Sequence, residues 1–285
     1  MVLPSCGQAY GYATEVSGMQ SRSTSFVERT HVERWLAGVC LIALSAVYLF
    51  LQPGGDLMVA ARKRELPIYN VSRTEKVLSI SFDAAWGDAN TLKLLDLLDQ
   101  YNVKTTFFLV GIWVERYPEL VQEIVARGHE IGNHSTTHPH MTQCSDTKII
   151  QELRVTSDRI EELTGIRPSL FRPPYGDYND KVVTLSRQEG YECIQWNVDS
   201  LDWKNLGAQN MITQSTRKVA SGDIVLFHND SKYLLDALPT ILDRYVSLGY
   251  QVIPISELLL QGETTIDYQG TQHPKDPNPQ GVSSI

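Results

Sequence analysis

The chain is predicted to fold as an α/β protein around a mostly parallel sheet. Between residues 76 and 260, short runs rich in β-branched and aromatic residues alternate with stretches of helical periodicity. Seven such strand–helix units fit in this range. Polar residues able to do chemistry stand where the predicted strands end, which is the edge where parallel α/β proteins build their active sites. The pattern suits either a barrel or an open, doubly wound sheet.

The predicted strands are short and largely apolar, with turn residues at their ends. In chain order they are VLSISFD (77–83), KTTFFLV (104–110), HEIGNH (129–134), SLFRPP (169–174), YECIQWN (191–197), DIVLFH (ending at His228) and YQVIPI (250–255). Helical spacing separates them, as at Leu92, Leu95 and Leu98. Gly128 is a typical stop after another helical segment.

The segment WLAGVCLIALSAVYLFL (35–51) has no charged residue, and as a helix it would extend about 26 Å at about 1.5 Å per residue. A buried core helix and a cleaved signal peptide are the alternatives. The segment has no amphipathic neighbours to cover it, and a polar stretch of 34 residues precedes it. An uncleaved single-pass anchor is therefore favoured, although the flanking charges leave its orientation open.

Composition completes the predicted organisation. The net charge of −8 argues against a nucleic-acid partner, and the four cysteines show neither CxxC spacing nor the density of a disulfide scaffold. The last segment is rich in Pro, Gly and Thr, which predicts disorder. The predicted parts are a polar head (1–34), a transmembrane anchor (35–55), a linker (56–75), the α/β domain (76–261) and a disordered tail (262–285).

Two histidines four residues apart, His134 and His138, are the first indication of a metal site. Side chains at this spacing can reach one divalent ion from a turn or a helix start. Taken alone, the pair would suit surface or capping histidines equally well. A hydrolytic metal site also needs an oxygen ligand, a base and an acid. Other strand ends supply such groups, namely Asp83, Arg172, Asp199, Asp202 and His228.

Five motifs then resemble those of a known family, in the family's order. They are SFDAAWGD (81–88), HSTTH (134–138), RPPYG (172–176), DSLDW (199–203) and LFH (226–228). The family is the polysaccharide deacetylases of the NodB-homology type (carbohydrate esterase family 4), which remove acetyl groups from N-acetylated sugars. The resemblance covers about 76–260. It implies a distorted (β/α)7 barrel, the NodB homology domain, in agreement with the seven units.

The resemblance implies four catalytic residues. Asp83 resembles the catalytic base, and Arg172 resembles the partner that keeps this carboxylate ionised. His228 resembles the acid that protonates the departing sugar amine, with Asp202 stabilising its charged form. The alternatives for the last three are structural: surface ion pairs for Arg172 and Asp202, and a satisfied buried histidine for His228.

Metal and substrate contacts are implied in the same way. His134 and His138 would be metal ligands, and the backbone N–H of Tyr175 would bind the oxyanion. The remaining substrate-binding positions are Pro174, Trp203 and Leu226, of which Trp203 and Leu226 resemble the walls of the acetyl pocket. Ordinary core packing is the alternative for Trp203 and Leu226.

One position departs from the family pattern. The usual first motif has a second aspartate that joins the two histidines on the metal, but Ala84 stands there and cannot ligate. Asp88 is the predicted replacement ligand, because Gly87 would let the loop bring its carboxylate to the rim. His140 is a further spare ligand. The FDAAWGD form resembles a sporulation-associated, membrane-anchored branch of the family.

The predicted function is metal-dependent removal of N-acetyl groups from cell-envelope polysaccharide, either peptidoglycan or chitin-like N-acetylglucosamine polymers. The predicted metal is zinc, with cobalt or nickel as alternatives. Such an enzyme is expected in the cell membrane with its catalytic domain outside. The alternative is a non-catalytic glycan-binding or envelope-assembly module, in which Ala84 has disabled the metal and Trp86, Tyr175 and Trp203 form a sugar-stacking groove.

Overall fold

The computed structural model describes residues 21–50 and 64–275, which fall into two compact units, Met1–Arg62 and Lys63–Ile285. The described part of the first unit is helix α1 (Ser21–Phe50). Among the described residues, no helix combines the length and the apolar character needed to cross a membrane. The structure therefore does not support the predicted anchor over 35–55, of which 51–55 lie outside the described residues. Much of the predicted head and linker also lies outside them.

The second unit is built on a parallel sheet with strand order β6-β5-β4-β3-β2-β8-β7, and β9 also pairs with β2. The strands are β2 (Val77–Ala84), β3 (Thr106–Leu109), β4 (Glu130–Asn133), β5 (Leu170–Phe171), β6 (Glu192–Cys193), β7 (Val198–Asp199), β8 (Ile224–His228) and β9 (Gln251–Val252). Every pairing among them is parallel. Within the described chain no ladder joins β6 to β7, so the sheet curls without closing. The predicted parallel α/β class is confirmed, and the barrel is an open one.

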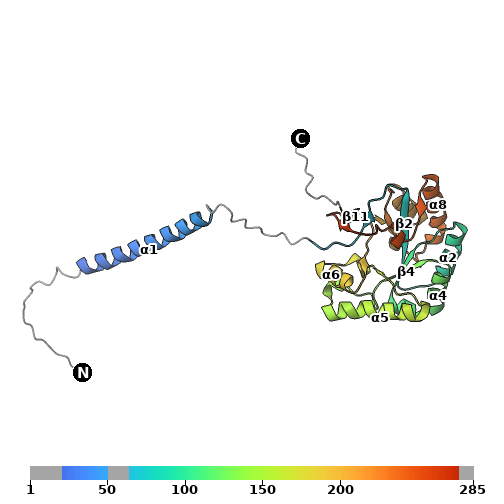
Figure 1. Ribbon diagram of the computed structural model, residues 1–285, viewed down its shortest axis with the longest axis horizontal. Coiled ribbons are helices and arrows are strands. Elements are labelled where there is room, and N and C mark those ends of the chain that lie inside the picture. The colour runs from blue at the N-terminus through green and yellow to red at the C-terminus, as the bar shows by residue number, and fades with distance from the viewer. Residues whose placement is uncertain (1–20, 51–63, 276–285) are drawn as a thin grey trace, which may run out of the picture. The chain divides into compact units, whose positions relative to one another are not determined.

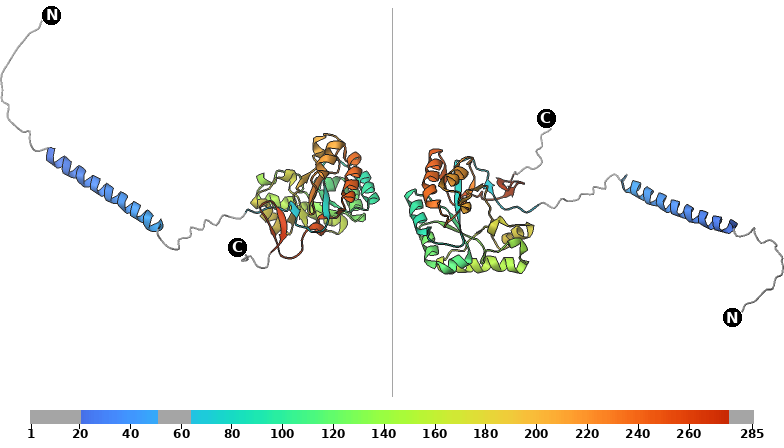
Figure 2. Two further views of the ribbon diagram at one scale, coloured as in Figure 1. Left: turned by 90° about the horizontal axis from the view of Figure 1, so that it is seen from above. Right: turned by 180° about the vertical axis from the view of Figure 1, so that it is seen from behind.

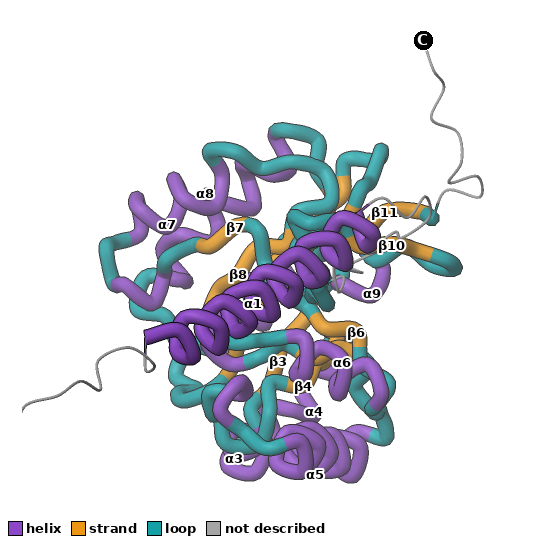
Figure 3. The backbone as a smooth tube through the Cα atoms, turned by 90° about the vertical axis from the view of Figure 1, so that its left-hand side faces the viewer, coloured by secondary structure: helices purple, strands orange, loops and turns teal. Residues whose placement is uncertain are grey.

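Helices cover the outside of this sheet (Figure 1). They are α2 (Thr91–Gln100), α3 (Gly111–Arg116), α4 (Pro118–Ala126), α5 (Asp146–Thr164), α6 (Asp180–Gln188), α7 (Ala208–Thr216), α8 (Leu234–Ser247) and α9 (Ile255–Leu258). Figure 2 shows the same arrangement from two further directions. In Figure 3, α7 and α8 lie on one side of strands β8, β3 and β4, and α3, α4 and α5 lie on the other. The loops that follow the carboxyl ends of the parallel strands therefore lie together along one edge of the sheet.

Each predicted strand overlaps an observed one, which is usually shorter by a few residues, whereas β2 runs one residue further than predicted, to Ala84. Strand β7 was not predicted, because its two residues carry no periodic signal. The helix that precedes Gly128 ends as expected, and this glycine has a left-handed φ of 76°.

The core under the rim is aromatic. Phe82 of β2 packs against Phe107 of β3 and Phe227 of β8, with ring centroids 5.1 and 5.7 Å apart. All three side chains are fully buried, and burial of a phenylalanine contributes roughly 1.5–3 kcal/mol. Ser81 is also buried in β2 and donates a hydrogen bond to the carbonyl of Val225 at 3.1 Å. Strand β2 is thus held firmly on both sides below the point where Asp83 emerges.

The prediction that the tail (262–285) is disordered is wrong for residues 262–275, the part that the structure describes. Strands β10 (Thr264–Ile266) and β11 (Thr271–Pro274) form a small sheet with β1 (Asn70–Val71), which lies in the predicted linker. Between them, the Asp267 carboxylate accepts hydrogen bonds from the backbone N–H groups of Gln269 and Thr271 at 2.8 and 2.9 Å. Pairing with a distant strand and this local turn give order that apolar periodicity does not reveal. Residues 276–285 lie outside the described part.

Candidate active site

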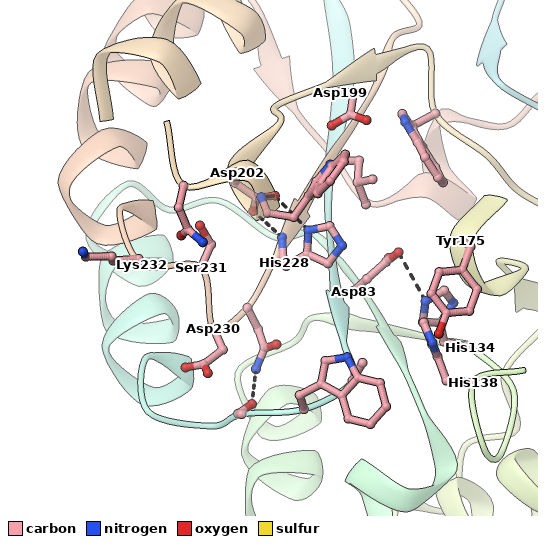
Figure 4. Close-up of a pocket in the computed structure, with 18 residues that line it drawn as sticks. Asp83, His134, His138, Tyr175, Asp199, Asp202, His228, Asp230, Ser231 and Lys232 are labelled. Carbon is pink, nitrogen blue, oxygen red and sulfur yellow. Dashed lines mark hydrogen bonds and ion pairs between the residues drawn. The ribbon is translucent and has the colours of Figure 1, made fainter. Parts of the chain in front are cut away.

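A pocket of about 820 Å³ opens where β2, β4 and β8 end (Figure 4). The residues that line it are Asp83, Ala85, Trp86, Gly87, His134, His138, Tyr175, Trp196, Asp199, Asp202, Trp203, Asn205, Leu226, His228, Asn229, Asp230, Ser231 and Lys232. The strand ends singled out from the sequence therefore do converge. Arg172 is the exception among them, because it lies beneath the pocket and is fully buried.

The centre of the site is a buried ion pair. Arg172 donates from Nη1 to Asp83 Oδ1 at 2.7 Å and from Nη2 to the carbonyl of Gln195 at 3.2 Å. Its guanidinium also lies 4.1 Å from the ring centroid of Phe108. Burial would raise the pKa of Asp83, but the charge of Arg172 holds it below its ordinary value. Asp83 is therefore a carboxylate at neutral pH, with Oδ2 free on the pocket side.

His134 is oriented by the same pair. Its Nδ1 lies 2.7 Å from the carbonyl oxygen of Arg172, and since a carbonyl can only accept, Nδ1 must carry the proton. Nε2 then carries no proton and has a free lone pair, and this nitrogen lies 3.4 Å from Oδ2 of Asp83. Burial lowers the pKa of His134, which keeps the ring neutral. Two lone-pair-bearing atoms thus face each other, an arrangement that favours a cation between or beside them.

His138 supplies a second neutral imidazole. Its ring centroid lies 5.0 Å from that of His134, and its φ of 57° is left-handed. Burial, with a smaller contribution from His134, lowers the pKa of His138 to about 4. Its Nδ1 is buried and has no hydrogen-bond partner among the described residues. Metal ligation requires neutral imidazole nitrogens that are free of other partners, so the pair fits two ligands of a divalent ion.

The loop that carries these histidines is held by Glu152 of α5, which is fully buried. One carboxylate oxygen accepts from the backbone N–H groups of Thr136 and Thr137, both at 2.7 Å. The other accepts from Thr137 Oγ1 and from Lys148 Nζ, both at 2.8 Å. Ser135 and His138 both have left-handed φ values, so these contacts stabilise a strained turn. Sequence reasoning missed Glu152, because a carboxylate in mid-helix gives no signal.

The part of the chain that the structure describes supplies no third ligand. Ala84 is fully buried and does not line the pocket. Asp88 is exposed and also lies outside the lining, and its backbone carbonyl accepts from the N–H of Thr91 at the start of α2. His140 stacks on Tyr175 instead, with ring centroids 4.4 Å apart. Among the described residues, no group of three or more His, Cys, Asp or Glu side chains is placed to hold a metal. The structure does not support Asp88 as a replacement ligand.

Across the pocket, His228 and Asp202, the predicted acid and its partner, are in direct contact. His228 donates from Nδ1 to Asp202 Oδ1 at 2.8 Å and from its backbone N–H to Oδ2 at 2.7 Å. Burial would lower the pKa of His228, but the hydrogen bond and charge of Asp202 raise it above its ordinary value. The ring is thereby favoured as an imidazolium. Its second nitrogen, Nε2, is available to donate a proton into the pocket.

Three of the four predicted substrate-binding residues line the pocket. Leu226 is buried in its wall, whereas Trp203 and Tyr175 are exposed at its edge. Tyr175 has a φ of 60°, and strain at a non-glycine residue is typical of functional turns. Pro174 does not line the pocket and is buried under the turn. Its role is to shape the backbone that presents Tyr175.

Comparison with known proteins gives one consistent result. The family described as polysaccharide deacetylase matches residues 70–194. A Bacillus cereus protein named peptidoglycan-N-acetylglucosamine deacetylase is 36% identical over 196 residues, which are 67% of this chain and 92% of the relative. A Bacillus subtilis peptidoglycan-N-acetylmuramic acid deacetylase is 34% identical, and the match covers 66% of this chain and 40% of that protein.

A solved structure adds a second point. A pseudoenzyme of family CE4 from Bacillus anthracis is 34% identical, with a TM-score of 0.66 and coverage of 68% of this chain and 69% of the other. A mutant of this pseudoenzyme, described as having restored enzymatic activity, is 36% identical with the same TM-score, and it covers 68% of this chain and 71% of the other. This fold thus occurs both in a protein named as a peptidoglycan deacetylase and in a pseudoenzyme.

The role of Glu152 leads to a first prediction. In Glu152→Gln, an amide N–H₂ replaces one acceptor, and a buried backbone N–H or hydroxyl loses its partner. Hydrogen bonds to charged groups contribute ~1.5–3 kcal/mol, so the free energy of unfolding in urea should fall by about 2 kcal/mol. The NMR signals of the His138 ring should shift as the turn relaxes. Glu162→Gln, at an exposed position of the same helix, is the control and should change neither. Unmoved His138 signals in Glu152→Gln would contradict the assigned role.

A second prediction concerns pH. Asp202→Asn removes the anion that raises the pKa of His228, so NMR titration should show this pKa lowered, while that of the distant His129, about 4, stays unchanged. When folding raises the pKa of a histidine, the resulting stabilisation is fully present below the unfolded-state pKa of about 6.5. It is lost as the pH rises through the folded-state pKa. The stability advantage of the wild type over Asp202→Asn should therefore shrink as pH rises. An unshifted His228 titration would show that Asp202 does not control this ring.

Proposed function

Because the chain belongs to the polysaccharide deacetylase family, we propose that it hydrolyses the N-acetyl groups of N-acetylglucosamine residues in peptidoglycan. The predicted family and the predicted enzyme class, a carbohydrate N-deacetylase, are confirmed by the relatives. Names of several of these relatives support peptidoglycan as the polymer. This substrate would place the second unit outside the cytoplasmic membrane.

One observation carries the proposal: a carboxylate held ionised and an imidazole favoured as imidazolium face the same pocket. The pKa of Asp83 is lowered and that of His228 is raised. Groups whose pKa values are pushed apart by their surroundings can act as base and acid at one pH. Amide hydrolysis needs both, because water must lose a proton and the departing amine must gain one.

The chain's own residues account for the proton transfers. Asp83 Oδ2 accepts a proton from the attacking water, while Arg172 keeps the carboxylate in place. The water oxygen bonds to the acetyl carbon, and the backbone N–H of Tyr175 would donate to the oxyanion. His228 then protonates the sugar nitrogen as the C–N bond breaks, giving acetate and a free amine. Leu226 and Trp203 would enclose the acetyl methyl group.

A divalent ion is part of the proposal. His134 and His138 would hold it, zinc being the first candidate and cobalt or nickel the alternatives. When bound, it would supply Lewis-acid polarisation of the acetyl carbonyl. Two protein ligands are fewer than the three of a usual catalytic zinc site, so weak binding is expected.

A second function is favoured by Ala84. A glycan-binding role without turnover would follow if two imidazoles cannot retain the ion, and the neighbour from Bacillus anthracis shows that this fold includes a pseudoenzyme. The exposed rings of Trp86, Trp203 and Tyr175 at the pocket would then bind the polysaccharide.

A third prediction separates the two functions. The full chain, supplied with excess zinc, should release acetate from N-acetylated peptidoglycan, and Asp83→Asn should lower the rate by at least about 100-fold, because a positioned base contributes ~10²–10⁴-fold. Acetate is measured enzymatically, and circular dichroism checks that the variant is folded. Wild-type release that survives Asp83→Asn would contradict the assigned base. No release by the wild type, together with release by Ala84→Asp, would establish the binding role instead.

A further inference from the structure

We propose that Asp177 is a positioning residue for the proposed reaction. Its carboxylate joins the turn that presents the backbone N–H of Tyr175 to the loop that carries His134 and His138. The inference rests on the proposed hydrolysis, in which that N–H donates to the oxyanion. It concerns a residue to which neither the motifs nor the proposed proton transfers assign a role.

The backbone at Tyr175 has to be held in place by its surroundings. Tyr175 stands in the middle of the short turn η2 (Pro174–Gly176) and has a left-handed φ of 60°. A residue with a Cβ keeps this conformation only where other contacts impose it. Bonds inside the turn, such as that from the N–H of Asp177 to the carbonyl of Pro174 at 2.9 Å, shape it. They do not fix it relative to the pocket.

Asp177 provides that fixation through Thr142. Its Oδ2 accepts from the backbone N–H of Thr142 at 3.0 Å and from Thr142 Oγ1 at 2.8 Å, and its Oδ1 lies 3.0 Å from the same hydroxyl. Thr142 belongs to the turn η1 (Met141–Gln143), which follows the histidine loop directly. Hydrogen bonds to a carboxylate are among the stronger ones in proteins. The turn after β5 is therefore tied to the loop after β4.

Aromatic packing continues this contact to Tyr175 itself. The Tyr175 ring stacks on that of His140, with centroids 4.4 Å apart and an angle of 21° between the planes. It also meets His138 edge to face, with centroids 4.5 Å apart, and Figure 4 shows the two side by side at the pocket. His140 Nδ1 lies 3.7 Å from Asp177 Oδ2. The role left for His140 is thus to pack Tyr175 against the histidine loop.

These contacts predict a specific kinetic effect. Asp177, Thr142 and His140 do not line the pocket, so changing them leaves the substrate contacts in place. An oxyanion donor acts on the charge that develops in the transition state, and it must point to where that charge appears. A turn that is free to move would therefore lower kcat and leave KM nearly unchanged.

The first test is steady-state acetate release by the full chain in excess zinc, with soluble fragments of N-acetylated peptidoglycan as the probe. Asp177→Ala should lower kcat about tenfold, less than the ~10²–10³-fold of a lost oxyanion donor, and change KM by less than about twofold. Thr142→Ser should keep the wild-type kcat. Asp158→Ala is the control, because it removes an exposed carboxylate paired with Arg167 at 2.8 Å. It should change neither constant.

The second test does not depend on turnover. In ¹H–¹⁵N spectra of the full chain, the backbone amide signal of Tyr175 should shift in Thr142→Val, which loses the hydroxyl donor at a position distant in the sequence. Thr213→Val makes the same exchange at an exposed position of α7 and should leave that signal in place. A Tyr175 signal that does not move in Thr142→Val would overturn the positioning role.

The two tests separate this role from the proposed reaction. If the wild type releases acetate and Asp177→Ala has the same kcat, the reaction stands and the positioning role fails. The role also fails if Asp158→Ala lowers kcat as much as Asp177→Ala does. If the wild type releases no acetate, the proposed reaction fails. A Tyr175 signal that shifts in Thr142→Val would then still support the fixation of the turn by Asp177.

Discussion

The buried ion pair between Asp83 and Arg172 is the interaction on which the site depends. Removing one partner of such a pair leaves an uncompensated buried charge, which costs about 3–5 kcal/mol, so the two residues persist only together. The pair joins the end of β2 to the residue that follows β5, two strands that are not neighbours in the sheet. Through its backbone carbonyl, Arg172 also sets which nitrogen of His134 is free. Base and first ligand are thus oriented by one residue.

Around this pair the pocket keeps three histidines in two different states. For His134 and His138, burial outweighs the nearby charge of Asp83 and lowers both pKa values, so both rings are neutral. His228 is also buried, but the carboxylate of Asp202 outweighs the burial and favours the charged ring. The side chains share one cavity, so the direct hydrogen bond of His228 to Asp202, and not residue type, separates the predicted acid from the two predicted ligands.

The sequence predicted the parts of the site that sit at strand ends. Asp83, His134, Arg172, Asp202 and His228 all follow or end runs with a clear β pattern, and parallel pairing brings such positions together whatever the loops do. Groups whose placement depends on a loop path could not be found in this way. Asp88, predicted as a replacement ligand, is exposed in the loop before α2 and lies outside the pocket lining. Glu152 reaches the histidine loop from mid-helix. Strand β11 pairs with β1, about 200 residues earlier in the chain, and β10 pairs with β11.

Ala84 makes metal retention the most direct test of the account. Calorimetric titration of the chelator-treated full chain with zinc, repeated on His138→Ala, measures whether two imidazoles suffice. The account predicts one ion per chain, bound more weakly than at a three-ligand site and lost in the variant. Zinc binding that is undiminished in His138→Ala would contradict the assigned ligands, and the absence of any zinc binding by the wild type would contradict the metal-assisted centre itself.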